Sequence, residues 1–419
     1  MIRSTKHTLK DLNGGKSNML RLFCAEYSRV CKLVIDEIWD NGYVVADDMR
    51  AKGWTDFNSD DKQMLSLPNK LDYKKFNIET SLSARAFQCC VNQAGGIIRA
   101  SVTKQRKVEF YRQKHANYKG KDNKFSKPVL EQDVSPQLNA NCLNIQKCKS
   151  GRFWGFIELK SLGEQFGKIR VPILGHKQFN KWLNRGMDIC NSVSIFKKSL
   201  QLSLERDIEP HPQGDKVIGI DQGLKTVATL SDGQTTPDVD AHGHSLDAIL
   251  DKLSRKTKDS NAFGRAQKHR KNFINWCINQ LNFDGLKEVR LEKIVNIGYK
   301  SGRSRKLSHW TNTEIRDKIT SLCESLEVPI VLQDSTYRSQ RCHSCGNVRK
   351  ANRSGKTYSC KNCGTVCDAD HNAAMNHEAD LPNIPFGLRG RKLNIGKGFF
   401  WNPDGIKTFD GQELIVPAY

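Results

Sequence analysis

The sequence lacks the long hydrophobic runs that membrane insertion and export require. No stretch of 18 apolar residues occurs, and the N-terminus, MIRSTKHTLKDLNGG, has no apolar segment. A membrane-spanning helix needs about 20 consecutive apolar residues, and a secretory signal needs an apolar core of roughly 7 to 15. We therefore expect neither a membrane span nor a membrane partner, and a cytoplasmic location.

Acidic residues are also scarce. The chain has 45 Asp and Glu against 67 Lys and Arg, for a formal charge of +22. Between Arg99 and Lys127 there are ten basic residues and two acids, and between Asp251 and Lys271 there are eight and two. This clustering predicts a phosphate polymer as partner. The candidate nucleic-acid-binding residues are Arg99, Lys104, Arg106, Lys107, Arg112, Arg303, Arg305 and Lys306.

Cysteine is plentiful, with fourteen in the chain. Without an export signal, we interpret these residues as reduced thiols and metal ligands rather than as disulfides. The stretch CHSCGNVRKANRSGKTYSCKNCG contains two C-x2-C pairs, and the predicted ligands of one structural zinc are Cys342, Cys345, Cys360 and Cys363. The glycine after each pair, Gly346 or Gly364, suits the positive φ of such a turn. Four thiolates would leave no open coordination position, so this zinc would not catalyse.

The hydrophobic pattern changes character along the chain. Apolar residues at helical spacing predict helices over 18–39 and 81–115, followed by short strands over 130–215. Further on we predict a hairpin at 216–233, a basic helical segment at 245–282, a strand at 289–294, a helix at 312–326 and a strand at 328–334. Strands that alternate with helices indicate an α/β layer.

Two of these strands carry an acid. Asp221 ends the apolar run VIGI, and Glu292 lies inside VRLEKI. A carboxylate on a buried strand is costly unless it binds a cation or finds partners. Two such strands in a basic protein indicate a site for two Mg²⁺ ions, held about 3.5–4 Å apart, of the kind that hydrolyses phosphodiesters.

A third carboxylate is expected from CDADHNAAMNH, residues 367–377. Asp370 shares a helix face with Ala373 and Ala374, whose small side chains would let that helix approach the sheet closely. Asp368 precedes the helix, and we interpret it as the N-cap. We set aside the two histidines of this stretch, His371 and His377, because magnesium prefers oxygen ligands. We interpret Cys367 as a spare thiol.

The motifs GIDQGLKTVATLSDG, LEKI, YRSQRCHSCG, YSCKNCG and DADHNAAMN occur in this order within residues 216–378. They resemble the TnpB family of transposon-encoded RNA-guided nucleases and their descendants, the compact type V CRISPR effectors. The resemblance implies a multidomain α/β protein, with a RuvC-like nuclease of the RNase H fold and an inserted zinc ribbon. It also implies an N-terminal helical recognition domain and a small β-barrel wedge domain.

The implied segments follow the chain in order. They are 1–18 (first wedge strand), 19–129 (recognition), 130–215 (wedge), 216–336 (first nuclease part), 337–367 (zinc ribbon) and 368–419 (last nuclease helix and tail). By resemblance the metal-binding triad is Asp221, Glu292 and Asp370. Family members pair an RNA guide with target DNA, read a short adjacent motif, and cut DNA in the RuvC-like site.

The resemblance makes guide RNA and double-stranded target DNA the expected partners, in a prokaryotic, nucleoid-associated protein. Whether one or two chains bind each guide stays open. Arg338 departs from the family, which commonly has Thr before Ser-Gln in this motif. Two alternatives are kept: an RNA-guided repressor that binds without cutting, and an unguided nuclease or transposase. A repressor would be expected to have lost at least one acid, and all three are present.

Overall fold

The chain divides into two units, Met1–Asp207 and Ile208–Tyr419, each with its own hydrophobic core. The computed structural model describes residues 1–58, 67–114, 126–149, 151–294, 312–385 and 392–414, together with Lys306, His309 and Leu388. The six segments implied by the family resemblance stay a prediction. In the part of the chain that is described, no helix is both long enough and apolar enough to cross a membrane.

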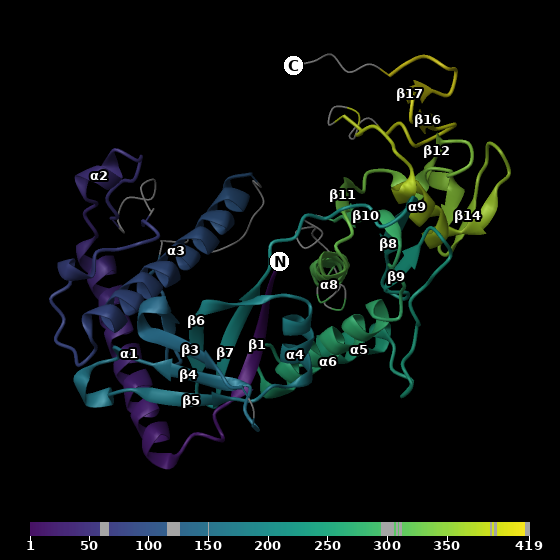
Figure 1. Cartoon of the computed structure of the whole chain (residues 1–419). Helices are drawn as coiled ribbons and strands as arrows, with labels where there is room; N and C mark the ends of the chain where they lie inside the picture. The colour runs from purple at the N-terminus through teal and green to yellow at the C-terminus, as the bar shows by residue number, and fades with distance from the viewer. Residues whose placement is uncertain are drawn as a thin grey trace. The chain divides into compact units, whose positions relative to one another are not determined.

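Two long helices organise the first unit (Figure 1). The helix predicted at 18–39 is α1 (Gly14–Asn41), and the helix predicted at 81–115 is α3 (Ala84–Lys114). The side chain of Asn13 caps α1 by accepting a hydrogen bond from the Lys16 amide at 2.9 Å. The apolar stripe of α1 is buried, as its spacing predicts.

Short strands form two antiparallel sheets in the same unit. One has the order β1-β7-β6-β2 and the other β3-β4-β5. The strands are β1 (Ile2–Thr8), β2 (Gln137–Asn139), β3 (Leu143–Lys147), β4 (Gly155–Leu159), β5 (Ile169–Ile173), β6 (Asp188–Phe196) and β7 (Ser199–Glu205). The remaining α-helices of the unit in the described residues are α2 (Asp47–Arg50) and α4 (Lys177–Asn184). Because β1 pairs with β7, the first strand of the chain lies beside the last strand of this unit.

The second unit is built on a four-stranded sheet with the order β11-β10-β8-β9. Strands β8, β10 and β11 are parallel, and β9 runs antiparallel to β8 at the edge. The strands are β8 (Lys216–Gln222), β9 (Ala228–Leu230), β10 (Leu286–Lys293) and β11 (Ile330–Asp334). The predicted hairpin, strands and α/β layer are therefore present.

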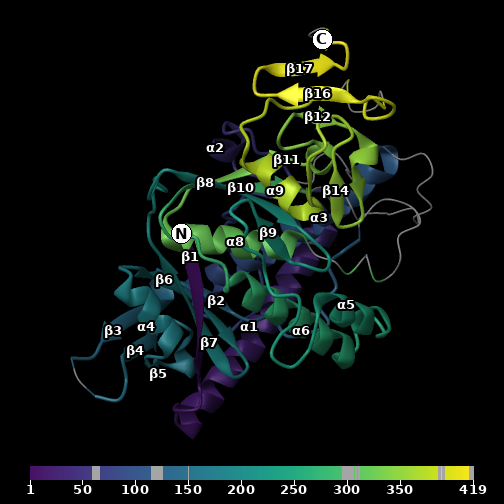
Figure 2. The same ribbon diagram turned by 90° about the vertical axis from the view of Figure 1, so that its right-hand side faces the viewer.

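Helices cover both faces of this sheet (Figure 2). Ile218 and Ile220 of β8 lie in one apolar cluster with residues of α5 (Leu246–Ser254), α6 (Asn261–Ile278) and α8 (Asn312–Leu326). Because side chains alternate along a strand, Gly219 and Asp221 face the other way. On that second face lies α9 (Ala369–Glu378).

The Cys-rich segment forms small sheets beside α9. Strands β13 (Arg353–Ser354), β14 (Thr357–Ser359) and β15 (Val366–Asp368) pair in that order. Strand β12 (Asn347–Val348) pairs instead with β16 (Phe399–Asn402), which pairs with β17 (Gly405–Thr408). Part of the C-terminal tail, whose role the sequence did not indicate, thus extends the Cys-rich segment.

Candidate metal centres

Helix α9 lies unusually close to strand β8. A Cβ atom at Gly219 would collide with the carbonyl oxygen of Ala374 and the backbone nitrogen of Glu378. Ala373 and Ala374 are fully buried at the same contact. The close approach predicted from the two alanines is present, and it also depends on a glycine in the facing strand.

The start of α9 is fixed by Asp368. Its Oδ1 accepts hydrogen bonds from the backbone amides of Asp370 at 2.9 Å and His371 at 3.0 Å. The interpretation of Asp368 as the N-cap is therefore confirmed. Asp370 is the second residue of the helix that this cap begins. Its side chain faces the sheet and is buried.

Two acids and a histidine meet at the ends of the central parallel strands. Leu291 of β10 pairs with Ile220 of β8, which places Glu292 beside Asp221 at the same edge. Single ligand atoms of Asp221, Glu292 and His377 all lie within 4.8 Å of one another. Ligand sites in open α/β sheets form at the carboxyl ends of the strands.

Burial raises the pKa of Asp221 well above its usual range, and the neighbouring carboxylates of Glu292 and Asp370 raise it further. Burial also raises the pKa of Glu292 to about 7, against an opposing hydrogen bond from Ser335. Each shift records a carboxylate whose negative charge is poorly compensated. A divalent cation is the partner that such an arrangement accepts most readily.

Asp370 lies near this group, but its own charge is compensated. Its carboxylate accepts a 2.9 Å hydrogen bond from Arg353 Nη2 and a second one from Lys356 Nζ. Both cations lie in or beside β13 and β14. Asp370 remains close enough to contribute to the electrostatics of Asp221. The structure thus brings Asp221 and Glu292 together and places Asp370 beside them, held by two basic residues.

His377 is the site residue that sequence reasoning set aside. Its side chain is 1% exposed, and burial lowers its pKa to about 3, so the imidazole is neutral and able to act as a ligand. A signal was present in the sequence, because residue 377 is two helical turns after Asp370 and shares its face with Ala373 and Ala374.

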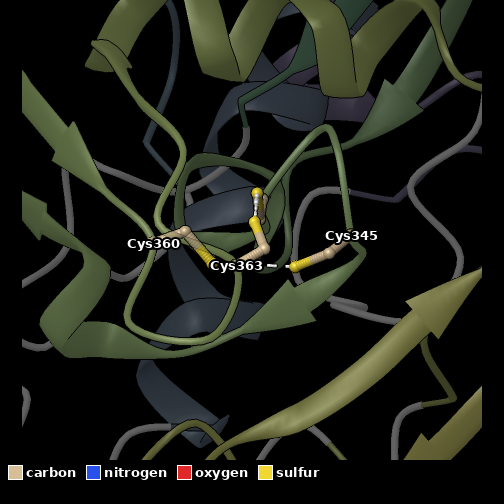
Figure 3. Close-up of side chains that lie close together, drawn as sticks. Cys345, Cys360 and Cys363 are labelled. Carbon is tan, nitrogen blue, oxygen red and sulfur yellow. Dashed lines mark hydrogen bonds between the residues drawn. The ribbon is translucent and has the colours of Figure 1, made fainter.

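The four predicted zinc ligands form a second cluster, and Figure 3 labels three of them, Cys345, Cys360 and Cys363. The sulfur atoms of Cys342 and Cys363 are 3.6 Å apart, as are those of Cys345 and Cys360, and all four lie within 4.8 Å of one another. Four sulfur atoms that surround a zinc ion tetrahedrally, with Zn–S bonds of about 2.3 Å, are expected to lie about 3.8 Å from one another.

The local backbone of each C-x2-C pair supports the same interpretation. Gly346 donates its amide hydrogen to the Cys342 carbonyl at 2.9 Å, and Gly364 donates to the Cys360 carbonyl at 3.1 Å. Both glycines have φ near 77°, at 76° and 78°, as predicted. Cys367 lies outside the four-sulfur group. The cluster is consistent with a zinc ribbon.

The contacts of Arg338 account for an arginine at this position, where the resembled family commonly has Thr. Its buried guanidinium donates from Nε to the Asp334 carbonyl at 3.0 Å and from Nη1 to the Asn376 carbonyl. It also lies over the Trp401 ring, 5.2 Å from the centroid. A residue that departs from the resembled motif thus ties the end of β11, α9 and the C-terminal hairpin together.

The predicted nucleic-acid-binding residues have varied surroundings. Lys104 and Lys107 are exposed on α3 and Arg106 is half-buried, whereas Arg99 donates to the Pro68 carbonyl. Lys306 lies 2.8 Å from a carboxylate oxygen of Asp247 and 3.6 Å from one of Asp251. The Arg112 side chain, Arg303 and Arg305 lie outside the described residues. The nucleic-acid contacts themselves stay a prediction.

Comparison with known proteins gives a consistent set of relatives. The family model "Cas12f1-like, TNB domain" matches residues 313–377. The chain is 29% identical over 143 residues to the CRISPR-associated endodeoxyribonuclease Cas12f1 of Sulfoacidibacillus thermotolerans. The matched stretch covers 34% of this chain and 32% of that protein. It is 25% identical over 252 residues to the putative RNA-guided DNA endonuclease InsQ of Escherichia coli strain K12, covering 51% and 62%.

Among solved structures, a Cas12f1–sgRNA–target DNA complex matches with a TM-score of 0.44 and 12% identity, covering 90% of this chain and 98% of that one. A likeness at that score decides nothing about function. The matched stretches span only about a third of the length of the two Cas12f1 relatives, 32% and 34%. The sequence matches nevertheless confirm the resemblance: the chain is similar to Cas12f1 nucleases and to putative RNA-guided DNA endonucleases such as InsQ.

Proposed function

We propose that this chain is an RNA-guided DNA endonuclease that hydrolyses phosphodiesters at Asp221, Glu292 and Asp370. The observation that carries the proposal is the pair Asp221 and Glu292, side by side at the ends of parallel strands. Burial raises the pKa of both carboxylates, and repulsion from Glu292 and Asp370 raises that of Asp221 further, so the pair needs a cation. Structural residues are seldom arranged this way without compensation.

Two Mg²⁺ ions fit the oxygen donors of the site. Asp221 and Glu292 would hold them, and Asp370 would join once Arg353 and Lys356 release its carboxylate. The chemistry that bound Mg²⁺ supplies in such a site is activation of a water and stabilisation of the leaving 3′ oxygen, which leaves a 5′ phosphate. Gly219, Ala373 and Ala374 keep α9 against β8 and so hold Asp370 beside the strand acids.

We assign a structural zinc to Cys342, Cys345, Cys360 and Cys363. The four sulfurs would close its coordination, so the ion would stabilise the ribbon and take no part in cleavage. The ribbon contributes Arg353 and Lys356 to the surroundings of Asp370. Its folding is therefore coupled to the electrostatics of the acidic site.

Guide RNA and target DNA are the proposed partners. The net charge of +22 favours phosphate backbones, and two relatives are named as putative RNA-guided DNA endonucleases. In guided nucleases sequence is read by base pairing, whereas the protein contacts the backbone and a short adjacent motif. We expect the basic residues of α3 and α6 to contact phosphates rather than bases.

The experiment begins with the RNA that co-purifies with the chain. Its sequence defines a matched DNA target, and the reconstituted complex is assayed for cleavage in Mg²⁺ with matched and mismatched targets. We expect cleavage of the matched target alone. Binding of that target without cleavage would favour the RNA-guided repressor, and equal cleavage after removal of all RNA would favour an unguided nuclease or transposase.

A further inference from the structure

His377 occupies a position in the acidic site that an oxygen-only magnesium centre does not require. It lies on α9, two turns after Asp370, and its side chain is 1% exposed. A ring nitrogen lies within 4.8 Å of carboxylate oxygens of both Asp221 and Glu292. Two carboxylates and one imidazole therefore converge on a single small volume.

A second contact fixes how the imidazole can act. His377 Nδ1 lies 3.4 Å from the side-chain oxygen of Gln333. Gln333 pairs with Glu292 across β11 and β10, so it belongs to the same row of the sheet. An amide oxygen accepts hydrogen bonds, which places the imidazole hydrogen on Nδ1 and leaves a lone pair on Nε2. Metal-binding histidines characteristically donate their other ring nitrogen to such an acceptor.

We propose that His377 supplies an imidazole nitrogen to the metal pocket of Asp221 and Glu292, and that this nitrogen makes the pocket favour Mn²⁺ over Mg²⁺. The inference rests on the proposed function in one respect, that the acidic pair binds a divalent metal. Mg²⁺ strongly prefers oxygen, whereas imidazole suits transition metals. Mn²⁺ accepts carboxylates as well as nitrogen, so a mixed donor set shifts the balance toward it.

The most direct test is pulsed electron paramagnetic resonance of Mn²⁺ bound to the zinc-loaded full chain. Coupling to a directly bound imidazole nitrogen is expected in the wild type and should be absent in His377→Leu. Asp221→Asn serves as the blank for Mn²⁺ bound elsewhere, for example at Asp240, His244 and His269, whose ligand atoms also lie within 4.8 Å of one another. Wild-type Mn²⁺ without nitrogen coupling above this blank overturns the inference.

Calorimetric titration gives the preference itself. We expect the ratio of the Mg²⁺ to the Mn²⁺ dissociation constant to fall about tenfold or more in His377→Leu. The matched control is His371→Leu on the same helix, half-buried and outside the metal-binding group, which should leave the ratio unchanged. Gln333→Leu keeps the ligand but removes the acceptor that orients it, and should lower the ratio by a smaller factor.

The outcomes separate this inference from the proposed function. If Mg²⁺ supports guided cleavage and the ratio in His377→Leu stays within twofold of the wild type, the inference alone is wrong. If neither metal binds in an Asp221-dependent manner, both are wrong. If His377→Leu does not fold, the nitrogen coupling of the wild type and the ratio measured with Gln333→Leu still decide.

Discussion

Gly219 of β8 lies directly beneath the carbonyl of Ala374 in α9, with no room for a side chain between them. This contact sets the distance between the helix that carries Asp370 and His377 and the strand that carries Asp221. The acidic site therefore depends on Gly219, which has no side chain and cannot itself bind a metal.

The first prediction follows from this contact. Gly219→Ala should lower the free energy of unfolding by about 1 to 3 kcal/mol, because the added methyl group meets backbone atoms that cannot rotate away. It should also weaken Asp221-dependent metal binding. Urea unfolding and metal titration of the purified chain measure the two effects.

Gly264 provides the matched control. It lies inside α6, and no heavy atom lies within 4 Å of the position that its Cβ would take. Gly264→Ala should raise stability by up to about 1 kcal/mol through helix propensity. An equal loss of stability in both variants would contradict the close approach of α9 to β8.

A second prediction concerns the cysteine cluster. The purified chain should contain one zinc per molecule, and Cys342→Ser should lose it and unfold at lower temperature, because three thiolates hold zinc less tightly than four. Metal analysis and thermal unfolding measure this. Cys367→Ser is the control, since Cys367 lies outside the four-sulfur group, and loss of zinc in that variant would contradict the assignment.

The third prediction concerns Arg338. Arg338→Ala should lower the free energy of unfolding by about 2 to 4 kcal/mol, because the half-buried Asp334 carbonyl and the buried Asn376 carbonyl lose a charged donor. Arg255→Ala removes an arginine whose ion pair with Asp251 is largely exposed, and should change stability by less than about 0.5 kcal/mol. Comparable losses in the two variants would show that the buried contacts contribute little.

A fourth prediction concerns pH and the first unit. Hydrogen bonds from Arg29, Thr80 and the Ser81 amide lower the pKa of Glu26 from 4.5 to about 2. Since the folded-state pKa is below the unfolded one, this contribution is fully present above about pH 5. It is lost as the pH falls toward 2.

Glu26→Gln should therefore destabilise the chain by about 1 to 2 kcal/mol at pH 7, and the difference from the wild type should shrink between pH 5 and pH 3. Urea midpoints at several pH values measure it. A difference that is constant from pH 7 to pH 3 would show that the carboxylate charge is not responsible.

The sequence predicted local structure well, because local structure depends on residues close in the chain. The apolar spacing of α1 and α3, the acid-bearing strands β8 and β10, and the cap at Asp368 were all predicted from neighbouring residues. The Cys-x2-Cys pairs likewise carry their geometry in a few residues. Family resemblance supplied the implied domain order, which stays a prediction.

The parts that were missed depend on contacts between distant residues. Pairing of β16 with β12 joins Phe399 to Val348, and no local pattern indicates that partner. The two cations beside Asp370 reach it from the β13–β14 hairpin, whose position depends on the whole ribbon. His377 differs, because its helical spacing from Asp370 was visible in the sequence, and it was set aside on ligand chemistry alone.

The most direct test of the proposed function is cleavage of the matched DNA target by the reconstituted complex, with Asp221→Asn beside the wild type. We predict that the wild type cuts in the presence of divalent metal, whereas Asp221→Asn binds the target equally well and does not cut. Cleavage by Asp221→Asn at the wild-type rate would show that the chemistry occurs elsewhere and would contradict the proposed site.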